Sequence, residues 1–185
     1  MNRREFLKKA GVGSATIGGY QALEAMLSTP AWAVSPGSHG FFFQVVSHST
    51  TSSDLVIISG CGRIKNGVKG GGSFTHFVPA DGPPFPIVAT GHWQAEQLAS
   101  FETIGSYGEL VAGVAEMEIV ADITAPFTDR TEATLKIVCN IGPAGLVTGE
   151  GEEGVTLSVP EAGLTFVPSS PPSGLTIFTM GFFGG

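Results

Sequence analysis

The sequence is poor in charged residues, and poor in positive charge above all. Only 14% of its 185 residues are charged, and nine lysines and arginines stand against sixteen aspartates and glutamates. The formal net charge of −7 argues against a surface that attracts nucleic acid or an anionic membrane. We therefore expect neither as a partner.

Motifs that would indicate a known chemistry are also lacking. The chain contains no nucleophile-elbow serine, no HExxH zinc motif, no phosphate-binding glycine loop and no EF-hand spacing. It has no internal repeat of the kind that builds solenoids. No stretch approaches the roughly 20 nearly continuous apolar residues that a membrane-spanning helix needs. We predict no metal site, no cofactor and no membrane span in the mature chain.

The basic residues that are present gather at the N-terminus, in the stretch NRREFLKKAG (2–11). Arg3 and Arg4, followed by Phe6 and Leu7, resemble the twin-arginine export signal, although Asn2 stands where Ser or Thr is common. This resemblance implies recognition by the twin-arginine translocase. The mature protein is then expected in the periplasm or outside the cell.

A cleavage site follows the signal. The stretch STPAWAVS (28–35) offers Ala31 and Ala33 as a small-x-small pair for a signal peptidase. We predict a helical signal peptide over 1–33 and a single domain over 34–185. The first segment holds four of the nine basic and two of the sixteen acidic residues, so the mature domain carries a net charge of −9.

The mature domain is rich in segments that favour β-strands. They contain many β-branched and aromatic residues and are separated by turn-forming clusters. The expected strands are 41–48, 54–64, 68–78, 86–95, 109–123, 133–141, 154–159 and 174–180. The best candidate for a helix, 94–101, is also compatible with a strand. We predict an all-β fold, a single antiparallel β-barrel or β-sandwich of about eight strands.

Asn66-Gly67 is the favoured pair for a two-residue β-hairpin turn. In that register Cys61 pairs with Gly72 and Ile57 with His76. One face would then hold Leu55, Ile57, Cys61, Phe74, His76 and Val78, and we predict that this face is buried. His76 is expected there without a charged partner.

Five glycines, Gly60, Gly62, Gly70, Gly71 and Gly72, lie across from one another in this hairpin. Glycines in strands mark a bend or make room for a bulky neighbour. The segment VKGGGSF (68–74) is also similar to the glycine-rich strand of dirigent and allene-oxide-cyclase barrels. The similarity implies a barrel shape and assigns no functional residue.

Two cysteines are candidates for a cross-link. Cys61 lies on the predicted buried face, and Cys139 alternates with Leu135 and Ile137, so both point into one core in this interpretation. Outside the cytoplasm such a pair is typically a disulfide or two inert apolar side chains. We predict the disulfide.

A pocket is predicted from the same alternation. Trp93 falls on the more apolar face of its strand, with an indole N–H that needs a partner, whereas His92 falls on the solvated face. Phe74, His76, Trp93 and Tyr107 are the candidate pocket residues. Glu116, Glu118 and Asp122 share one strand face, which we interpret as solvent-exposed rather than catalytic.

Two functional classes fit this sequence. The first is an exported, non-enzymatic β-domain that binds a small apolar ligand or an extracellular protein partner. The second is an exported barrel enzyme of cyclase or isomerase type, with a shape-driven pocket to which Tyr107, Glu109 or His76 lends polarity. A cavity with convergent polar groups favours the enzyme, and a filled core favours the partner-binding module.

Overall fold

The structure, a computed structural model, describes residues 37–79 and 85–181. These residues form nine strands and two short 3-10 turns. The elements are β1 (His39–Ser49), β2 (Leu55–Ile64), β3 (Val68–Phe77), β4 (Ile87–Tyr107), β5 (Leu110–Ala125), β6 (Asp129–Cys139), η1 (Gly142–Ala144), β7 (Gly154–Val159), η2 (Pro160–Ala162), β8 (Leu164–Pro168) and β9 (Gly174–Met180). The predicted all-β, antiparallel fold is confirmed. The signal and cleavage residues lie outside the described residues.

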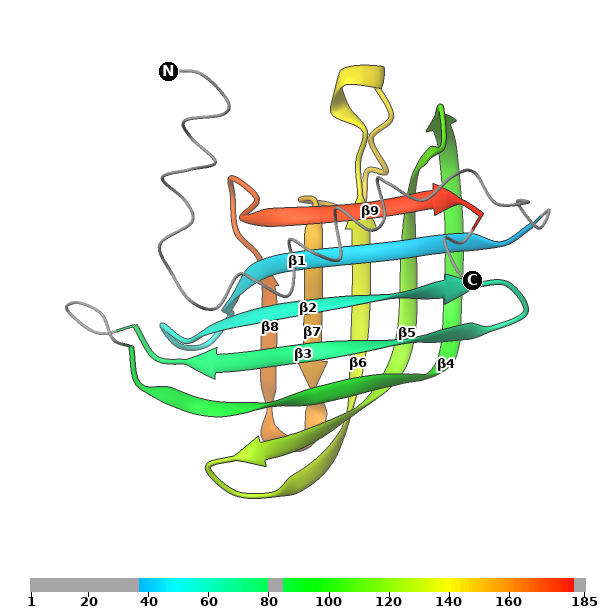
Figure 1. The fold of residues 1–185 in the computed structure, drawn as a ribbon. Coiled ribbons are helices and arrows are strands. Elements are labelled where there is room, and N and C mark those ends of the chain that lie inside the picture. Colours follow the sequence, from blue (N-terminus) through cyan, green and yellow to red (C-terminus); the bar gives the residue numbers. More distant parts are fainter. Residues whose placement is uncertain (1–36, 80–84, 182–185) are drawn as a thin grey trace, which may run out of the picture. The chain divides into compact units, whose positions relative to one another are not determined.

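The strands β1 to β8 close into a ring, because each pairs with the next along the chain and β8 returns to β1 (Figure 1). All of these pairings are antiparallel. One edge of β1 is shared: Ser47–Ser49 pairs with β8, and His39–Val45 pairs with β9. The other edge of β9, near its C-terminal end, pairs with Leu110 and Val111 of β5. A closed sheet leaves few unpaired backbone groups at its edges.

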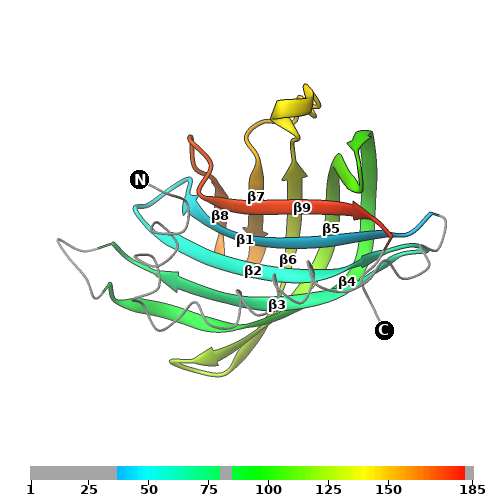
Figure 2. The ribbon, with the colours of Figure 1, turned by 45° about the horizontal axis from the view of Figure 1, so that its top comes forward.

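The ring is flattened into two layers. Strands β9, β1, β2 and β3 run side by side in front, and β5 to β8 cross behind them (Figures 1 and 2). The 21-residue strand β4 begins beside β3 and ends in the rear layer, so it forms a corner of the barrel. Such corners are built with β-bulges, and β4 carries four register shifts against β5.

Alternating side chains fill the space between the two layers. Phe41, Phe43 and Val45 point inward from β1, and Trp93 meets them from β4. The Phe43 ring stacks on Trp93 with centroids 5.8 Å apart, and the indole N–H donates to the Ser59 carbonyl at 3.0 Å. The partner expected for the Trp93 N–H is thus a backbone oxygen of β2.

The β2–β3 hairpin has a different register from the predicted one. The last pair is Ile64 with Val68, and three residues connect the strands rather than two. Both members of this pair are buried, whereas the predicted register would place Lys65 opposite Val68. The longer turn therefore keeps the lysine out of the interior. Gly67 closes it with a φ of +127°, a conformation that favours glycine.

A shift of one residue exchanges the faces of β2, because side chains alternate along a strand. Val56 and Ile58 are buried, and Ile57 is 40% exposed. The predicted inward direction of Leu55, Ile57 and Cys61 is therefore wrong. On β3, Phe74 and His76 point inward as predicted. The one-residue difference in register therefore changes the inward set of β2 and leaves that of β3 as predicted.

The predicted disulfide is also wrong. Cys61 and Cys139 are both free thiols. Cys61 is exposed on the outer face of β2, whereas Cys139 is buried inside the barrel and its Sγ donates to the Thr176 carbonyl at 3.4 Å. Burial raises the pKa of the Cys139 thiol, so this side chain behaves as an inert apolar group. The exchanged faces of β2 separate the two sulfurs by the barrel wall.

The glycines of the hairpin lie where a side chain would overlap a neighbouring group. A side chain at Gly60 would overlap the Trp93 indole, and one at Gly72 would overlap the Ser59 carbonyl. Gly62 and Gly70 leave space for the ring of Phe41. The interpretation that these glycines admit a large side chain is confirmed for Gly60, Gly62 and Gly70, whereas Gly71 and Gly72 lie against the backbone of neighbouring strands.

The candidate helix 94–101 is part of β4. Its inward residues are Ala95, Leu98 and Phe101, three apart, because a register shift lies within each interval. No helix among residues 37–79 and 85–181 is long and apolar enough to cross a membrane.

Candidate functional site

One end of the barrel holds a cavity of about 300 Å³. It lies at the end of the barrel where strands β2, β4, β6 and β8 begin and strands β3, β5 and β7 end. The apolar lining residues are Val56, Ile58, Phe74, Ala89, Trp93, Ile119, Ala121, Ile123, Phe127, Leu157, Val159, Ala162, Leu164 and Phe166. Below it the barrel is filled by large buried side chains, among them Phe43 and Met117. The barrel is thus solid at its centre and hollow at this mouth.

His76 is one of four polar residues that line this cavity. Its Nε2 lies 2.9 Å from Asp54 Oδ2, and the two side chains are 12% and 20% exposed. Because a carboxylate only accepts, Nε2 is the protonated nitrogen and donates to Asp54. The edge of the imidazole also contacts Phe166, with centroids 5.1 Å apart. The expectation that His76 lacks a charged partner is wrong, because Asp54, just before β2, lies beside the end of β3.

The mouth of the cavity carries acidic groups. Asp129 and Thr131 come from the start of β6, and Glu161 comes from η2. The Thr131 hydroxyl donates to Glu161 Oε2 at 3.1 Å, which ties the two elements together. Phe127, 57% exposed, lies at the same mouth.

Three of the four candidate pocket residues line this cavity. Phe74, His76 and Trp93 are among its walls. Tyr107 is 67% exposed at the end of β4 and does not line it. Glu109, in the β4–β5 turn, is exposed as well.

The other histidines lie away from the cavity. His92 is exposed, as predicted, and so is His48. The ring of His39 packs on Phe101 with centroids 4.9 Å apart. Desolvation by burial lowers the pKa of His39, so this ring stays neutral near neutral pH.

The acidic residues of β5 lie on the outer face. Glu116, Glu118 and Asp122 are only partly covered and pair across the strands with Lys136, Thr134 and Arg130 of β6. In the acidic loop, Glu150 binds Lys136 Nζ at 2.7 Å, and this contact lowers the pKa of Glu150. Within the described part of the chain, no three histidine, cysteine or acidic side chains come together as a metal site.

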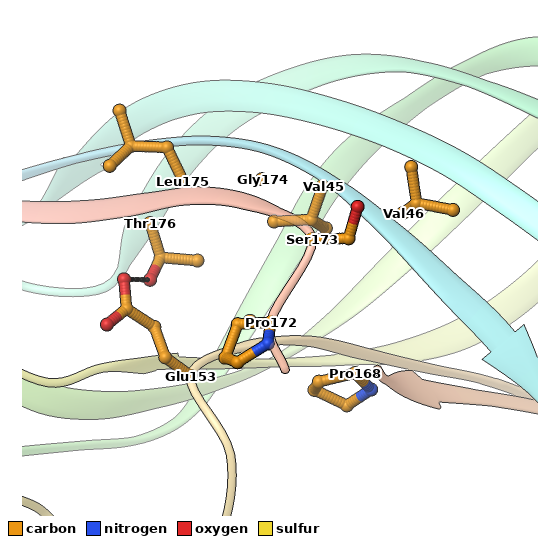
Figure 3. A pocket seen from close by; sticks show the side chains of 10 residues that line it. Val45, Val46, Glu153, Pro168, Pro172, Ser173, Gly174, Leu175 and Thr176 are labelled. Carbon is orange, nitrogen blue, oxygen red and sulfur yellow. Dashed lines mark hydrogen bonds between the residues drawn. The ribbon is translucent and has the colours of Figure 1, made fainter. Parts of the chain in front are cut away.

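A second, much smaller hollow lies between β1, β9 and the β8–β9 loop (Figure 3). Its volume of about 10 Å³ holds at most one water molecule. Thr176 donates to Glu153 Oε1 at 2.9 Å on its wall. This hollow is too small for an organic ligand.

Sequence reasoning missed the residues that come from loops and short elements. Asp54 directly precedes β2, Asp129 is the first residue of β6 outside the predicted strand 133–141, and Glu161 lies in η2, which was not predicted. Strand β8 was not predicted, although Leu164 and Phe166 alternate between Gly163 and Pro168. That short alternation bounded by turn residues is a signal that could have found it.

Comparison with known proteins gives no relative. No family model matches the chain, and searches of curated proteins and of solved structures return no match. The class of the protein therefore follows from its own geometry: a closed antiparallel β-barrel with an apolar cavity at one mouth.

Proposed function

We propose that this protein is an exported, non-enzymatic β-barrel that binds a small apolar ligand in its mouth. The observation that carries the proposal is the cavity of about 300 Å³ with a mostly apolar lining. This volume is at the lower end of the range for ligand pockets, which bury most of a small molecule. The filled core below it argues that the hollow is a local feature of the mouth and not loose packing.

Filling the cavity is expected to abolish binding. Ala121 lies on the cavity wall, so Ala121→Phe places a ring where the ligand would lie. We expect this variant to bind the neutral fluorescent probe N-phenyl-1-naphthylamine at least about tenfold more weakly than the unmodified protein, because part of the buried apolar area is lost. Binding is measured as the rise in probe fluorescence on titration.

Ala99→Phe is the matched control, since Ala99 is an exposed residue of β4. It should leave the affinity for the probe unchanged. Equal affinities for the two variants, or no probe binding by the unmodified protein, would contradict the proposal.

A second candidate function, a cyclase-like or isomerase-like enzyme, is favoured by one observation. His76 and Asp54 form a hydrogen-bonded pair on the cavity wall, and such pairs serve as general bases in enzymes. His76→Gln would keep a hydrogen-bonding side chain and remove the base. A binding protein would retain its affinity, whereas an enzyme would lose turnover of the molecule that native mass spectrometry finds in the purified protein.

We also propose export by the twin-arginine route, carried by Arg3 and Arg4 in the sequence. Replacing both with lysine is expected to retain the full-length precursor in the cytoplasm, because the arginine pair is what the translocase reads. Replacing Lys8 and Lys9 with glutamine is the control and should have less effect. Cell fractionation and N-terminal sequencing measure the result, and mature protein should begin at Val34. Normal export of the double-lysine variant would refute this route.

A further inference from the structure

We infer that the ligand of the mouth cavity carries a positive charge, as an amine attached to an apolar body. This inference rests on the proposed function and adds the charge of the ligand to it. The first observation is the composition of the lining. It includes two acidic residues, Asp129 and Glu161, which both lie at the mouth, and no lysine or arginine of the described part of the chain.

Basic side chains are directed away from this mouth. Arg130 lies between Asp129 and Thr131 in the sequence, so alternation along β6 places it on the outer face. There its guanidinium lies 3.6 Å from Glu96 Oε1 and 4.0 Å from Asp122 Oδ1. Among the described residues, no lysine or arginine lines the cavity.

Three more basic residues, Arg63, Lys65 and Lys69, gather at the β2–β3 turn. The cavity is lined by Val56 and Ile58 from the opposite part of β2. Ile58 and Ile64 are six residues apart, which corresponds to roughly 20 Å along a strand. A ligand carboxylate in the mouth would therefore meet negative charge without a nearby compensating cation.

The groups at the mouth suit an ammonium head. Glu161 is held by the Thr131 hydroxyl, which limits its freedom to turn away. Phe127 lines the same cavity as the two acidic residues, and aromatic rings attract cations. His76 faces Asp54 Oδ2 at 2.9 Å, so this histidine already has a carboxylate partner within the protein. The apolar walls would take the rest of the molecule.

The test compares three ligands that share one apolar chain. The full-length protein is loaded with N-phenyl-1-naphthylamine, and the probe is displaced with octylamine, 1-octanol or octanoate near neutral pH and at low salt. Asp129 and Glu161 are both exposed residues, so the expected preference is modest: octylamine should displace the probe at about fivefold to tenfold lower concentration than 1-octanol. Octanoate should be weaker than 1-octanol.

Neutralising the two acidic residues at the mouth should abolish the preference for octylamine over 1-octanol. In the double variant Asp129→Asn, Glu161→Gln, octylamine and 1-octanol should displace the probe at similar concentrations, with 1-octanol unchanged from the unmodified protein. The control variant Glu118→Gln, Glu132→Gln changes two exposed acidic residues with the same loss of charge and should keep the preference.

The outcomes separate the two proposals. Displacement by 1-octanol with no preference for octylamine, a preference for octanoate, or a preference that survives in the double variant would overturn the inference and leave the apolar ligand in place. Failure of the unmodified protein to bind the probe, or of all three chains to displace it, would overturn the proposed function itself.

Discussion

Gly60→Ala is expected to lower the free energy of unfolding by about 1–3 kcal/mol, the range for overpacking a close-packed core. The added methyl group would overlap the six-membered ring of Trp93. Trp93 has little room to retreat, because it is 1% exposed, stacks on Phe43 and donates its N–H to the Ser59 carbonyl. Ser59 directly precedes Gly60, so the clash and the hydrogen bond act on the same stretch of β2.

The measurement is chemical denaturation followed by circular dichroism. Cys61→Ala is the matched control, because Cys61 is the next residue and points out of the barrel. Its effect should stay within about 0.5 kcal/mol, as for most surface substitutions. Equal stability of the two variants would show that Gly60 does not make room for the indole.

The strands themselves were largely predictable from the sequence. The predicted bounds of β7 and β9, 154–159 and 174–180, agree with the structure. Both strands are short segments with alternating apolar residues, and each begins at a glycine with positive φ. Here local preference and tertiary packing favour the same conformation, so the sequence pattern is sufficient to predict where each strand begins and ends.

β4 shows why other parts were harder to predict. Its inward residues Ala95, Leu98 and Phe101 recur every third position, which is close to the period of a helix. The period arises because bulges insert an extra residue between successive inward side chains. Bulges depend on how the barrel turns its corner, and a local sequence pattern does not contain that information.

The predicted register of the β2–β3 hairpin was wrong for a related reason. Asn66-Gly67 correctly marks a turn, but the length of the connection is decided by which apolar residues must be buried. One additional residue exchanged the faces of β2 and removed the basis for the disulfide. Of the residues that line the cavity, Phe74, His76 and Trp93 lie within predicted strands and were predicted, whereas Asp129 and Glu161 lie outside the predicted strands and were missed.

Trp93→Ala is expected to have the largest effect on stability, about 3–5 kcal/mol, the range for truncating a buried aromatic side chain. The substitution removes the stacking partner of Phe43 and extends the mouth cavity into the core. It also removes the hydrogen bond from the indole N–H to the Ser59 carbonyl, which adds to the loss. His92→Ala, at the exposed neighbouring position, should change stability by less than about 0.5 kcal/mol. Comparable losses for the two variants would contradict the assignment of Trp93 to the core.

Combining the two substitutions tests their contact directly. If Gly60 is a glycine because Trp93 occupies the space above it, Gly60→Ala should be far less harmful once the indole is gone. In a double-mutant cycle, we expect the destabilisation caused by Gly60→Ala to be about 1–2 kcal/mol smaller in the Trp93→Ala protein than in the unmodified protein, within the range for residues in contact. Trp93→Phe keeps a smaller ring at this position and serves the same cycle if the alanine variant does not fold. Additive losses would mean that the glycine is required by the backbone of β2 itself. A positive coupling would show that the glycine-rich hairpin and the tryptophan at the floor of the cavity form one packing unit.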